Sequence, residues 1–105
     1  MLPKMKIIAI EKEKPDSTPE LFKEFSELEA IEAWNLYQEG FIREIYFRAD
    51  KSCAILILES NTLVEAKEIL QRLPFVKRGL ISFDLIPLKP YPGFSRLFKT
   101  QFSSE

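Results

Sequence analysis

The feature of this sequence that most constrains its fold is a run of six apolar residues, Cys-Ala-Ile-Leu-Ile-Leu, at positions 53–58. A β-strand with one face in water alternates polar and apolar side chains, so a strand made of this run needs cover on both faces. A chain of 105 residues forms one domain around one core, and its own helices can cover one face of a sheet. We therefore expect a second copy of the chain to cover the other face, in a homodimer or a larger homo-oligomer.

The composition excludes several classes of partner and cofactor. The formal net charge is −1, so we expect no basic surface for nucleic acid or for an anionic membrane. No apolar run approaches the roughly 20 residues of a membrane span. Residues 1–13 are too charged for a secretory signal, which predicts a cytoplasmic protein. Because the chain has no histidine and a single cysteine, Cys53, we expect no internal disulfide and no zinc, copper or haem site.

Four segments have the pattern of β-strands. Residues 7–10 form a second uninterrupted apolar run, so the first strand, like the third, is predicted to lie in the centre of the sheet. In the second strand, Arg43 shares one face with Ile45 and Phe47, and this mixture of charged and apolar residues is typical of an edge strand. Pro87 is predicted to end the last strand. The four expected strands are residues 5–11, 41–48, 53–59 and 80–86.

The first helix is predicted to begin after Thr18, with Pro19 in its first position, or at a capping box formed by residues 17 and 20. It should end at residue 38 or 39, because Gly40 suits a left-handed helix end. At about 100° per residue, two carboxylates, Glu29 and Glu32, project into the apolar stripe of this helix. The expected stripe consists of Leu21, Phe22, Phe25, Leu28 and Leu36.

The second helix is predicted to begin at a capping box of Thr62 and Glu65. It should end near residue 72 or 73, because Pro74 cannot continue a helix interior. We expect residues 1–105 to form a single domain in which residues 89–105 are an extended C-terminal tail. This tail is too apolar to leave in water, so we expect part of it to dock on the body or on a partner subunit. Its apolar residues are Tyr91, Phe94, Leu97, Phe98 and Phe102.

The expected element order is β-α-β-β-α-β, which predicts an α+β protein with the ferredoxin-like arrangement and an antiparallel four-stranded sheet of order 4-1-3-2. That order places the two uninterrupted apolar strands in the centre, in agreement with their composition. The fold does not determine function. RNA-recognition domains of this topology stack bases on aromatic residues of their first and third strands. Residues 7–10 and 53–58 contain no aromatic residue, so RNA binding on the sheet is not expected.

Between residues 20 and 88 several residues occur in a spacing that a known family shares. They are Glu29, Gly40, Arg43, Glu59 and the stop Leu73-Pro74-Phe75. In this respect the chain resembles the muconolactone isomerase family of dimeric α+β barrels. The resemblance implies a homodimer and a cofactor-free isomerase that moves a proton on a small unsaturated lactone or carbonyl compound. The sequence departs from the family pattern at Tyr46-Phe47, Asp50, Ala54 and Leu88-Lys89-Pro90.

Glu29 is the main candidate for a catalytic residue. A carboxylate on the sheet-facing side of a helix loses hydration, which raises its pKa and makes it a base near neutral pH. In that role Arg43 would stabilise the dienolate that forms when a proton leaves carbon. The alternative is a structural ion pair between Glu29 and Arg43, which would lower the pKa of Glu29 instead.

Three further residues are candidates for binding a substrate. Glu32 lies on the same stripe as Glu29, and its alternative role is a pair with an arginine. Arg48 could neutralise a carboxylate, and more often such a residue is a charge at a strand edge. Tyr46, like Trp34, could line a pocket for a ring compound or simply pack. Trp34 lies about 180° from the apolar stripe, which favours an interface over a site.

Two functions follow from these residues. The first is an isomerase-like enzyme with Glu29 as its base. The second is a non-catalytic homo-oligomeric module that binds a small organic ligand or a protein partner, which the apolar tail favours. A cavity beside Glu29 would support the first, and a closed ion pair in a packed interior would support the second.

Overall fold

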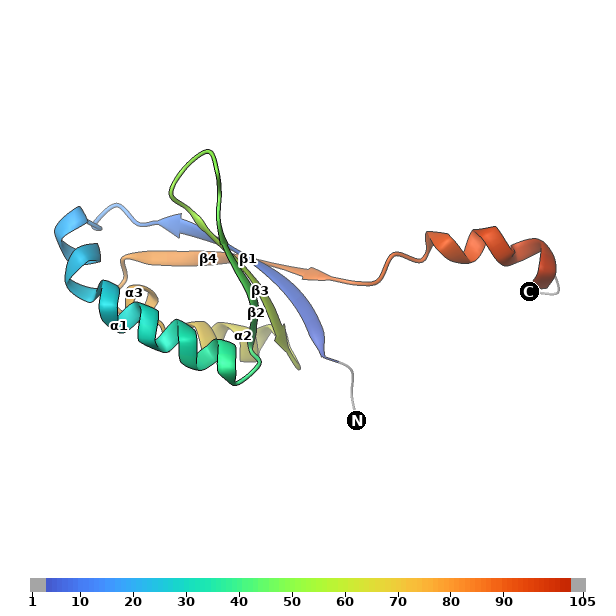
Figure 1. Cartoon of the computed structure of the whole chain (residues 1–105), viewed down its shortest axis with the longest axis horizontal. Helices are drawn as coiled ribbons and strands as arrows, with labels where there is room; N and C mark the ends of the chain where they lie inside the picture. The colour runs from blue at the N-terminus through green and yellow to red at the C-terminus, as the bar shows by residue number, and fades with distance from the viewer. Residues whose placement is uncertain (1–3, 103–105) are drawn as a thin grey trace.

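The computed structural model of the protein describes residues 4–102. Within these residues four strands form one antiparallel sheet in the order β2-β3-β1-β4, and the helices lie on one side of it (Figure 1). This confirms the ferredoxin-like α+β fold with β1 and β3 in the centre. The elements are β1 (Met5–Glu13), α1 (Pro19–Gln38), β2 (Ile42–Phe47), β3 (Ala54–Ser60), α2 (Leu63–Leu70), α3 (Pro74–Lys77), β4 (Ile81–Leu88) and a 3-10 helix, η1 (Gly93–Phe102).

The two long helices begin at the predicted caps. The Thr18 hydroxyl accepts a hydrogen bond from the backbone N–H of Leu21, at 3.2 Å. The Thr62 hydroxyl accepts one from the N–H of Glu65, at 3.0 Å. These bonds satisfy N–H groups that have no partner within the helix. After α1, Gly40 has a φ of +89°, a left-handed conformation that residues with a Cβ rarely adopt.

A third helix, α3, follows the expected stop. The preceding helix, α2, ends at Leu70, before the predicted residue 72 or 73, and Pro74 occupies the first position of α3. Proline is favoured there because the first N–H of a helix has no partner in any case. The prediction of a stop alone was therefore incomplete, and this short helix turns out to hold one of the site residues.

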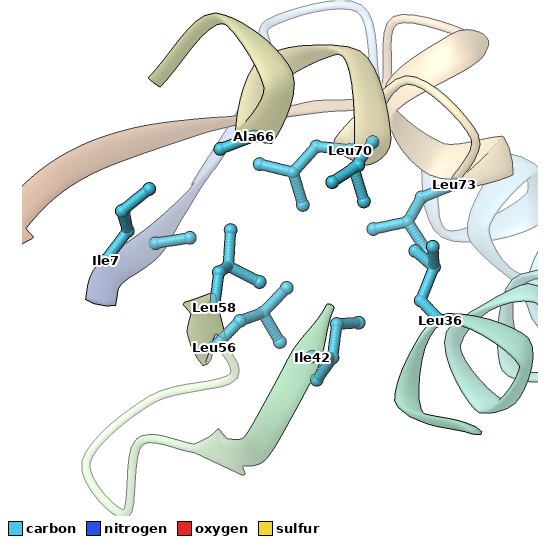
Figure 2. Close-up of a cluster of buried hydrophobic side chains, with 10 residues drawn as sticks. Ile7, Leu36, Ile42, Leu56, Leu58, Ala66, Leu70 and Leu73 are labelled. Atoms are coloured by element: carbon cyan, nitrogen blue, oxygen red, sulfur yellow. The ribbon is translucent and has the colours of Figure 1, made fainter. Parts of the chain in front are cut away.

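The core lies between the helices and one face of the sheet (Figure 2). Ile7 and Ala9 of β1 alternate with outward-facing residues, and Leu36 of α1 packs toward them with no exposed surface. Leu28, expected on the buried stripe of α1, is 55% exposed instead. The side chains of the core cluster are Ile7, Ala9, Leu36, Ile42, Leu56, Leu58, Ala66, Ile69, Leu70 and Leu73.

A β-bulge near the start of β2 changes which side chains face the helices. Ile42 pairs with Leu58, but Glu44 pairs with Ile57, so the register shifts across Arg43. A bulge adds one residue to one strand and reverses the alternation beyond it. The prediction that Arg43 shares a face with Ile45 and Phe47 was therefore wrong.

Strand β4 continues through Pro87 to Leu88, two residues beyond the predicted end. β4 is an edge strand that pairs only with β1, so the missing N–H of Pro87 removes no bond from a second neighbour. Within residues 4–102, no helix combines the length and the apolar character needed to cross a membrane.

The sheet face away from the helices is apolar and carries no helix (Figure 1). Isoleucines from three strands lie in register across it, with Ile8 of β1 opposite both Ile57 of β3 and Ile86 of β4. We call this surface, formed by Ile8, Ile10, Ile55, Ile57 and Ile86, the isoleucine face. It is the second face that the composition of β1 and β3 predicts.

The C-terminal tail leaves the body rather than docking on it. From residue 89 the chain extends away from the sheet and ends in η1 (Figure 1). The side chains of Tyr91, Phe94 and Leu97 are each more than 60% exposed. Docking on the chain's own body, one of the two expected outcomes, is thus not what the structure shows. The side chain of Phe102 lies outside the described residues.

Candidate functional site

A pocket of about 680 Å³ opens between α1 and the helix-side face of the sheet. Its size is within the range of sites for small molecules, and its lining is almost entirely apolar. Two carboxylates, Glu11 and Glu29, are the charged residues on this lining. The complete lining is Glu11, Ser26, Glu29, Ala30, Ala33, Trp34, Tyr37, Ile42, Ile45, Phe47, Ala54, Leu56, Leu73, Phe75, Ile81 and Phe83.

Small side chains on α1 leave room for this pocket. Ser26, Ala30 and Ala33 follow one another at spacings of four and three residues, so they lie along one side of the helix. Further along that side, the rings of Trp34 and Tyr37 stack with centroids 5.6 Å apart. Both rings are about half exposed and so lie at the mouth of the pocket.

Trp34 therefore lies at the pocket. It is two residues from the buried Leu36, so at 100° per residue it lies about 160° around the helix from that residue. The pocket reaches it because the lining continues around α1 through Ala33 and Tyr37. The reading of Trp34 as a pocket residue agrees with the structure, and its placement away from any site was wrong.

Glu29 is half-buried and borders the pocket, as its helical phase predicts. One carboxylate oxygen accepts a hydrogen bond of 2.8 Å from the backbone N–H of Phe75, in the first turn of α3. The ring of Phe75 packs edge-on against Phe22 of α1, with centroids 5.1 Å apart. This contact holds α3 beside α1 and brings the Phe75 N–H to Glu29. Within residues 4–102, no group donates a hydrogen bond to the second oxygen of Glu29.

Burial raises the pKa of Glu29 above the ordinary glutamate range, since a carboxylate loses hydration in apolar surroundings. The hydrogen bond from Phe75 N–H lowers the pKa and the negative charge of Glu11 raises it, and burial is the largest of the three effects. A raised pKa is the direction predicted for a base, whereas an ion pair would lower the pKa of Glu29.

Glu11 is the site residue that the sequence reading missed. It follows Ile7 and Ala9 at a period of two, so it lies on the helix side of β1. One of its oxygens accepts a hydrogen bond of 2.8 Å from the backbone N–H of Ala54 in β3. The alternation of positions 7, 9 and 11 was the available signal. It was hidden because Ile8 and Ile10 make the opposite face apolar as well.

Arg43 does not meet Glu29. Its guanidinium Nε is 3.8 Å from a carboxylate oxygen of Glu59. Glu59 alternates with Leu58 and Ser60, which are buried on the helix side, so this exposed pair lies on the other side of the sheet. The expected partnership of Arg43 and Glu29 was wrong in either form, as catalytic pair or as structural ion pair, because the bulge at β2 moves Arg43 off the helix-side face.

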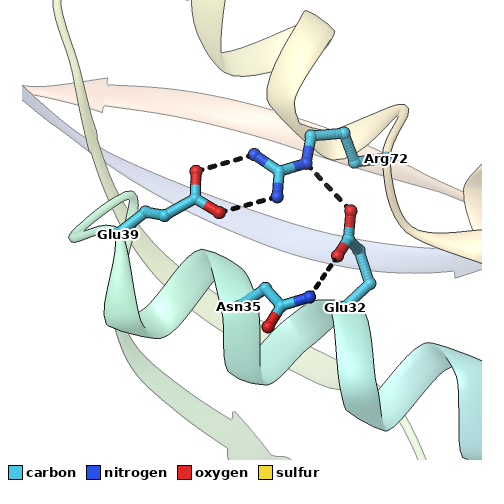
Figure 3. Close-up of polar contacts among 4 residues, drawn as sticks. All are labelled: Glu32, Asn35, Glu39 and Arg72. Atoms are coloured by element: carbon cyan, nitrogen blue, oxygen red, sulfur yellow. Dashed lines mark hydrogen bonds and ion pairs between the residues drawn. The ribbon is translucent and has the colours of Figure 1, made fainter.

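Glu32 belongs to an ion-pair network outside the pocket (Figure 3). Arg72, just after α2, donates to Glu32 at 2.9 Å and to both oxygens of Glu39 at 2.8 and 2.7 Å. These bonds hold the pKa of Glu32 and of Glu39 below the ordinary range and raise that of Arg72. Of the two roles considered for Glu32, the structure shows the pair with an arginine, which ties α1 to the end of α2.

The other two candidates, Tyr46 and Arg48, flank the pocket residue Phe47 but are not part of the lining. The Tyr46 hydroxyl donates a hydrogen bond of 2.6 Å to Glu44, and this bond raises the pKa of the phenol. Arg48 makes a two-pronged contact with Asp50 in the turn between β2 and β3, with Nε at 2.8 Å. Neither residue lines the pocket that Glu29 borders.

Among the described residues, no group of three or more cysteine and carboxylate side chains is placed to hold a metal ion. The chemistry that the pocket residues themselves offer is proton transfer by Glu29 and hydrogen bonding by Trp34 and Tyr37, whereas the Ser26 hydroxyl donates to the Lys23 carbonyl at 3.0 Å. No protein-family model matches this chain, and a search of curated proteins finds no match either.

Proposed function

We propose that the pocket binds a small unsaturated carbonyl compound or lactone and that Glu29 moves a proton on it without a cofactor. The observation that carries this proposal is a half-buried carboxylate with a raised pKa at the edge of an apolar pocket of about 680 Å³. A general base is most effective when its pKa lies near the working pH, and burial moves Glu29 in that direction.

The geometry supports a shift of a double bond by one carboxyl group. The Phe75 N–H holds one oxygen of Glu29, and the other oxygen takes a proton from a carbon activated by the carbonyl. The same carboxyl then returns the proton to a different carbon of the enolate, so the product is an isomer of the substrate and the carboxylate is regenerated. Hydroxyl and indole donors on the lining, from Tyr37 and Trp34, would serve the enolate oxygen in place of Arg43.

Deuterium exchange tests this proposal with a simple ketone. We expect the protein to accelerate exchange of the acidic protons of 2-tetralone in D₂O, followed by NMR and extrapolated to zero buffer. Glu29→Gln keeps an oxygen for the Phe75 N–H but removes the base, and should lower the rate by about 100-fold or more. Glu27→Gln, an exposed change on the same helix, is the matched control. Equal rates for Glu29→Gln and the unchanged protein would refute the role of Glu29.

A second candidate function is a homo-oligomeric module that binds such a ligand without chemistry. The isoleucine face favours it, because an apolar centre with a polar rim is typical of a protein interface. Charged pairs border this face, Lys12 with Asp84 and Arg43 with Glu59. We propose that two copies pack these faces together about a two-fold axis, as in a dimeric α+β barrel, with the tail reaching the partner. Binding of 2-tetralone without accelerated exchange would select the non-catalytic module.

A further inference from the structure

The charged residues on the pocket lining all have the same sign. Two carboxylates, Glu11 and Glu29, line it, and no lysine or arginine of the described residues does. Two arginines of neighbouring segments are engaged elsewhere: Arg72 with Glu32 and Glu39, and Arg78 over the ring of Phe25 at 4.8 Å. The pocket thus presents negative charge and nothing on its lining to balance it.

Both carboxylates are held in place from opposite sides of the pocket. Ala54 N–H in β3 binds one oxygen of Glu11, and Phe75 N–H in α3 binds one oxygen of Glu29, each at 2.8 Å. Because the backbone fixes them, neither carboxylate can turn out to water without leaving a buried N–H without a partner. A ligand in the pocket therefore meets two fixed negative groups in apolar surroundings, where charges interact more strongly than in water.

We propose that Glu11 and Glu29 make this pocket selective for uncharged ring compounds and that they exclude compounds carrying a carboxylate. Glu11 is then a specificity-determining residue, because it adds a second negative charge beside the proposed base. The inference rests on the pocket being the ligand site of the proposed function. The volume of about 680 Å³ suits a ligand of one or two fused rings with a neutral carbonyl group.

A matched pair of ligands isolates the charge. Tetralin-2-carboxamide and tetralin-2-carboxylate have the same rings and nearly the same shape, and at pH 8 they differ by one negative charge. The chain has one tryptophan, and Trp34 lies at the pocket mouth, so its fluorescence reports binding. We expect the carboxamide to bind at least tenfold more tightly than the carboxylate. A carboxylate that binds as tightly as the carboxamide would overturn the inference.

Variants of Glu11 then test its role in the selectivity. In Glu11→Gln the ratio of the two affinities should fall at least threefold, chiefly because the carboxylate binds better, whereas in Glu27→Gln it should be unchanged. A ratio that is the same in Glu11→Gln as in the unchanged protein contradicts the role of Glu11. Glu11→Asp, which keeps the charge, serves as the second variant and should retain the selectivity.

The outcome separates this inference from the proposed function. If the carboxamide and the carboxylate bind equally well while 2-tetralone exchange still depends on Glu29, the charge selectivity is wrong and the proton transfer stands. If neither compound changes the fluorescence of Trp34 or the NMR spectrum, the pocket is not a site for such rings, and both proposals are refuted together.

Discussion

The carboxyl of Glu29 carries opposing influences that a substitution can separate. Its folded-state pKa is raised, so folding favours the protonated form. The stability that protonation contributes is fully present below the unfolded pKa and is lost as the pH rises through the folded pKa. We expect Glu29→Gln to be at least as stable as the unchanged protein near neutral pH, because its amide avoids a buried charge and still accepts from Phe75 N–H.

Urea unfolding at several pH values measures the difference in stability between Glu29→Gln and the unchanged protein. The advantage of Glu29→Gln should appear as the pH rises above the ordinary glutamate range and should be constant once the folded-state carboxyl is ionised. Glu27→Gln should show no such trend. If Glu29→Gln instead lost stability on going to neutral pH, the negative charge of Glu29 would be favourable in the fold, and a base in an apolar site would be the wrong description.

At the scale of residues, the sequence predicted side-chain positions correctly in segments whose apolar residues follow a single regular period. The 3.6-residue period of α1 placed Glu29 toward the sheet, and the structure confirms it. The position of Arg43 could not be predicted, because a single bulge reverses the alternation and has no signature in this strand. Glu11 was missed for another reason. In a strand that is apolar on both faces, the alternation of side chains does not show on which face of the sheet a carboxylate near the end of the strand lies.

At the scale of elements, the pocket exists because α1 has small side chains beside the sheet. Ala33→Leu places a larger apolar side chain into the pocket, where there is space for it. We expect this variant to keep its stability and to lose binding of tetralin-2-carboxamide. In the filled core, Ala66→Leu is the matched control, since Ala66 is fully buried among packed side chains. It should cost about 1–3 kcal/mol of stability and leave binding intact.

Chemical denaturation and Trp34 fluorescence distinguish these two variants. A loss of stability in Ala33→Leu as large as that in Ala66→Leu would show that the space beside Ala33 is already filled. Unchanged ligand binding in Ala33→Leu would place the binding site elsewhere.

The order of elements was predicted correctly because capping residues and apolar periods are local signals. Thr18 and Thr62 cap the helices as expected, and the two uninterrupted apolar strands are central. The exceptions both involve proline. Pro74 begins α3 and does not end α2, which stops at Leu70, and Pro87 is tolerated in β4 since that strand has one neighbour only. The sequence around each proline permits either outcome, and the tertiary structure determines which one occurs.

At the scale of the whole molecule, the isoleucine face and the extended tail point to a second copy of the chain. Light scattering at micromolar concentration should give about twice the chain mass of 12.3 kDa, or a multiple of that dimer. Ile57→Lys puts a charge at the centre of the face and should shift the protein toward monomers. Val64→Lys, an exposed position on α2, is the control.

The tail should contribute to the same assembly. Truncation after Lys89 removes Phe94, Leu97 and Phe98, which are exposed in the single chain, and should weaken the dimer or lower the solubility of the protein. A truncated chain with the same assembly and the same melting temperature would show that the tail has no role in it. The sequence predicts assembly only indirectly. Its composition shows that a second face of the sheet is apolar and has to be covered, but it does not show what covers that face.

The most direct measurement of the central claim is an NMR pH titration of the Glu29 carboxyl carbon, assigned by its absence from the spectrum of Glu29→Gln. A base at an apolar pocket requires a midpoint above the ordinary glutamate range. The midpoint should rise further when tetralin-2-carboxamide fills the pocket, since the ligand displaces water from the carboxylate. A midpoint below the ordinary glutamate range, unchanged by the ligand, would mean that Glu29 is a paired structural carboxylate and would contradict the account.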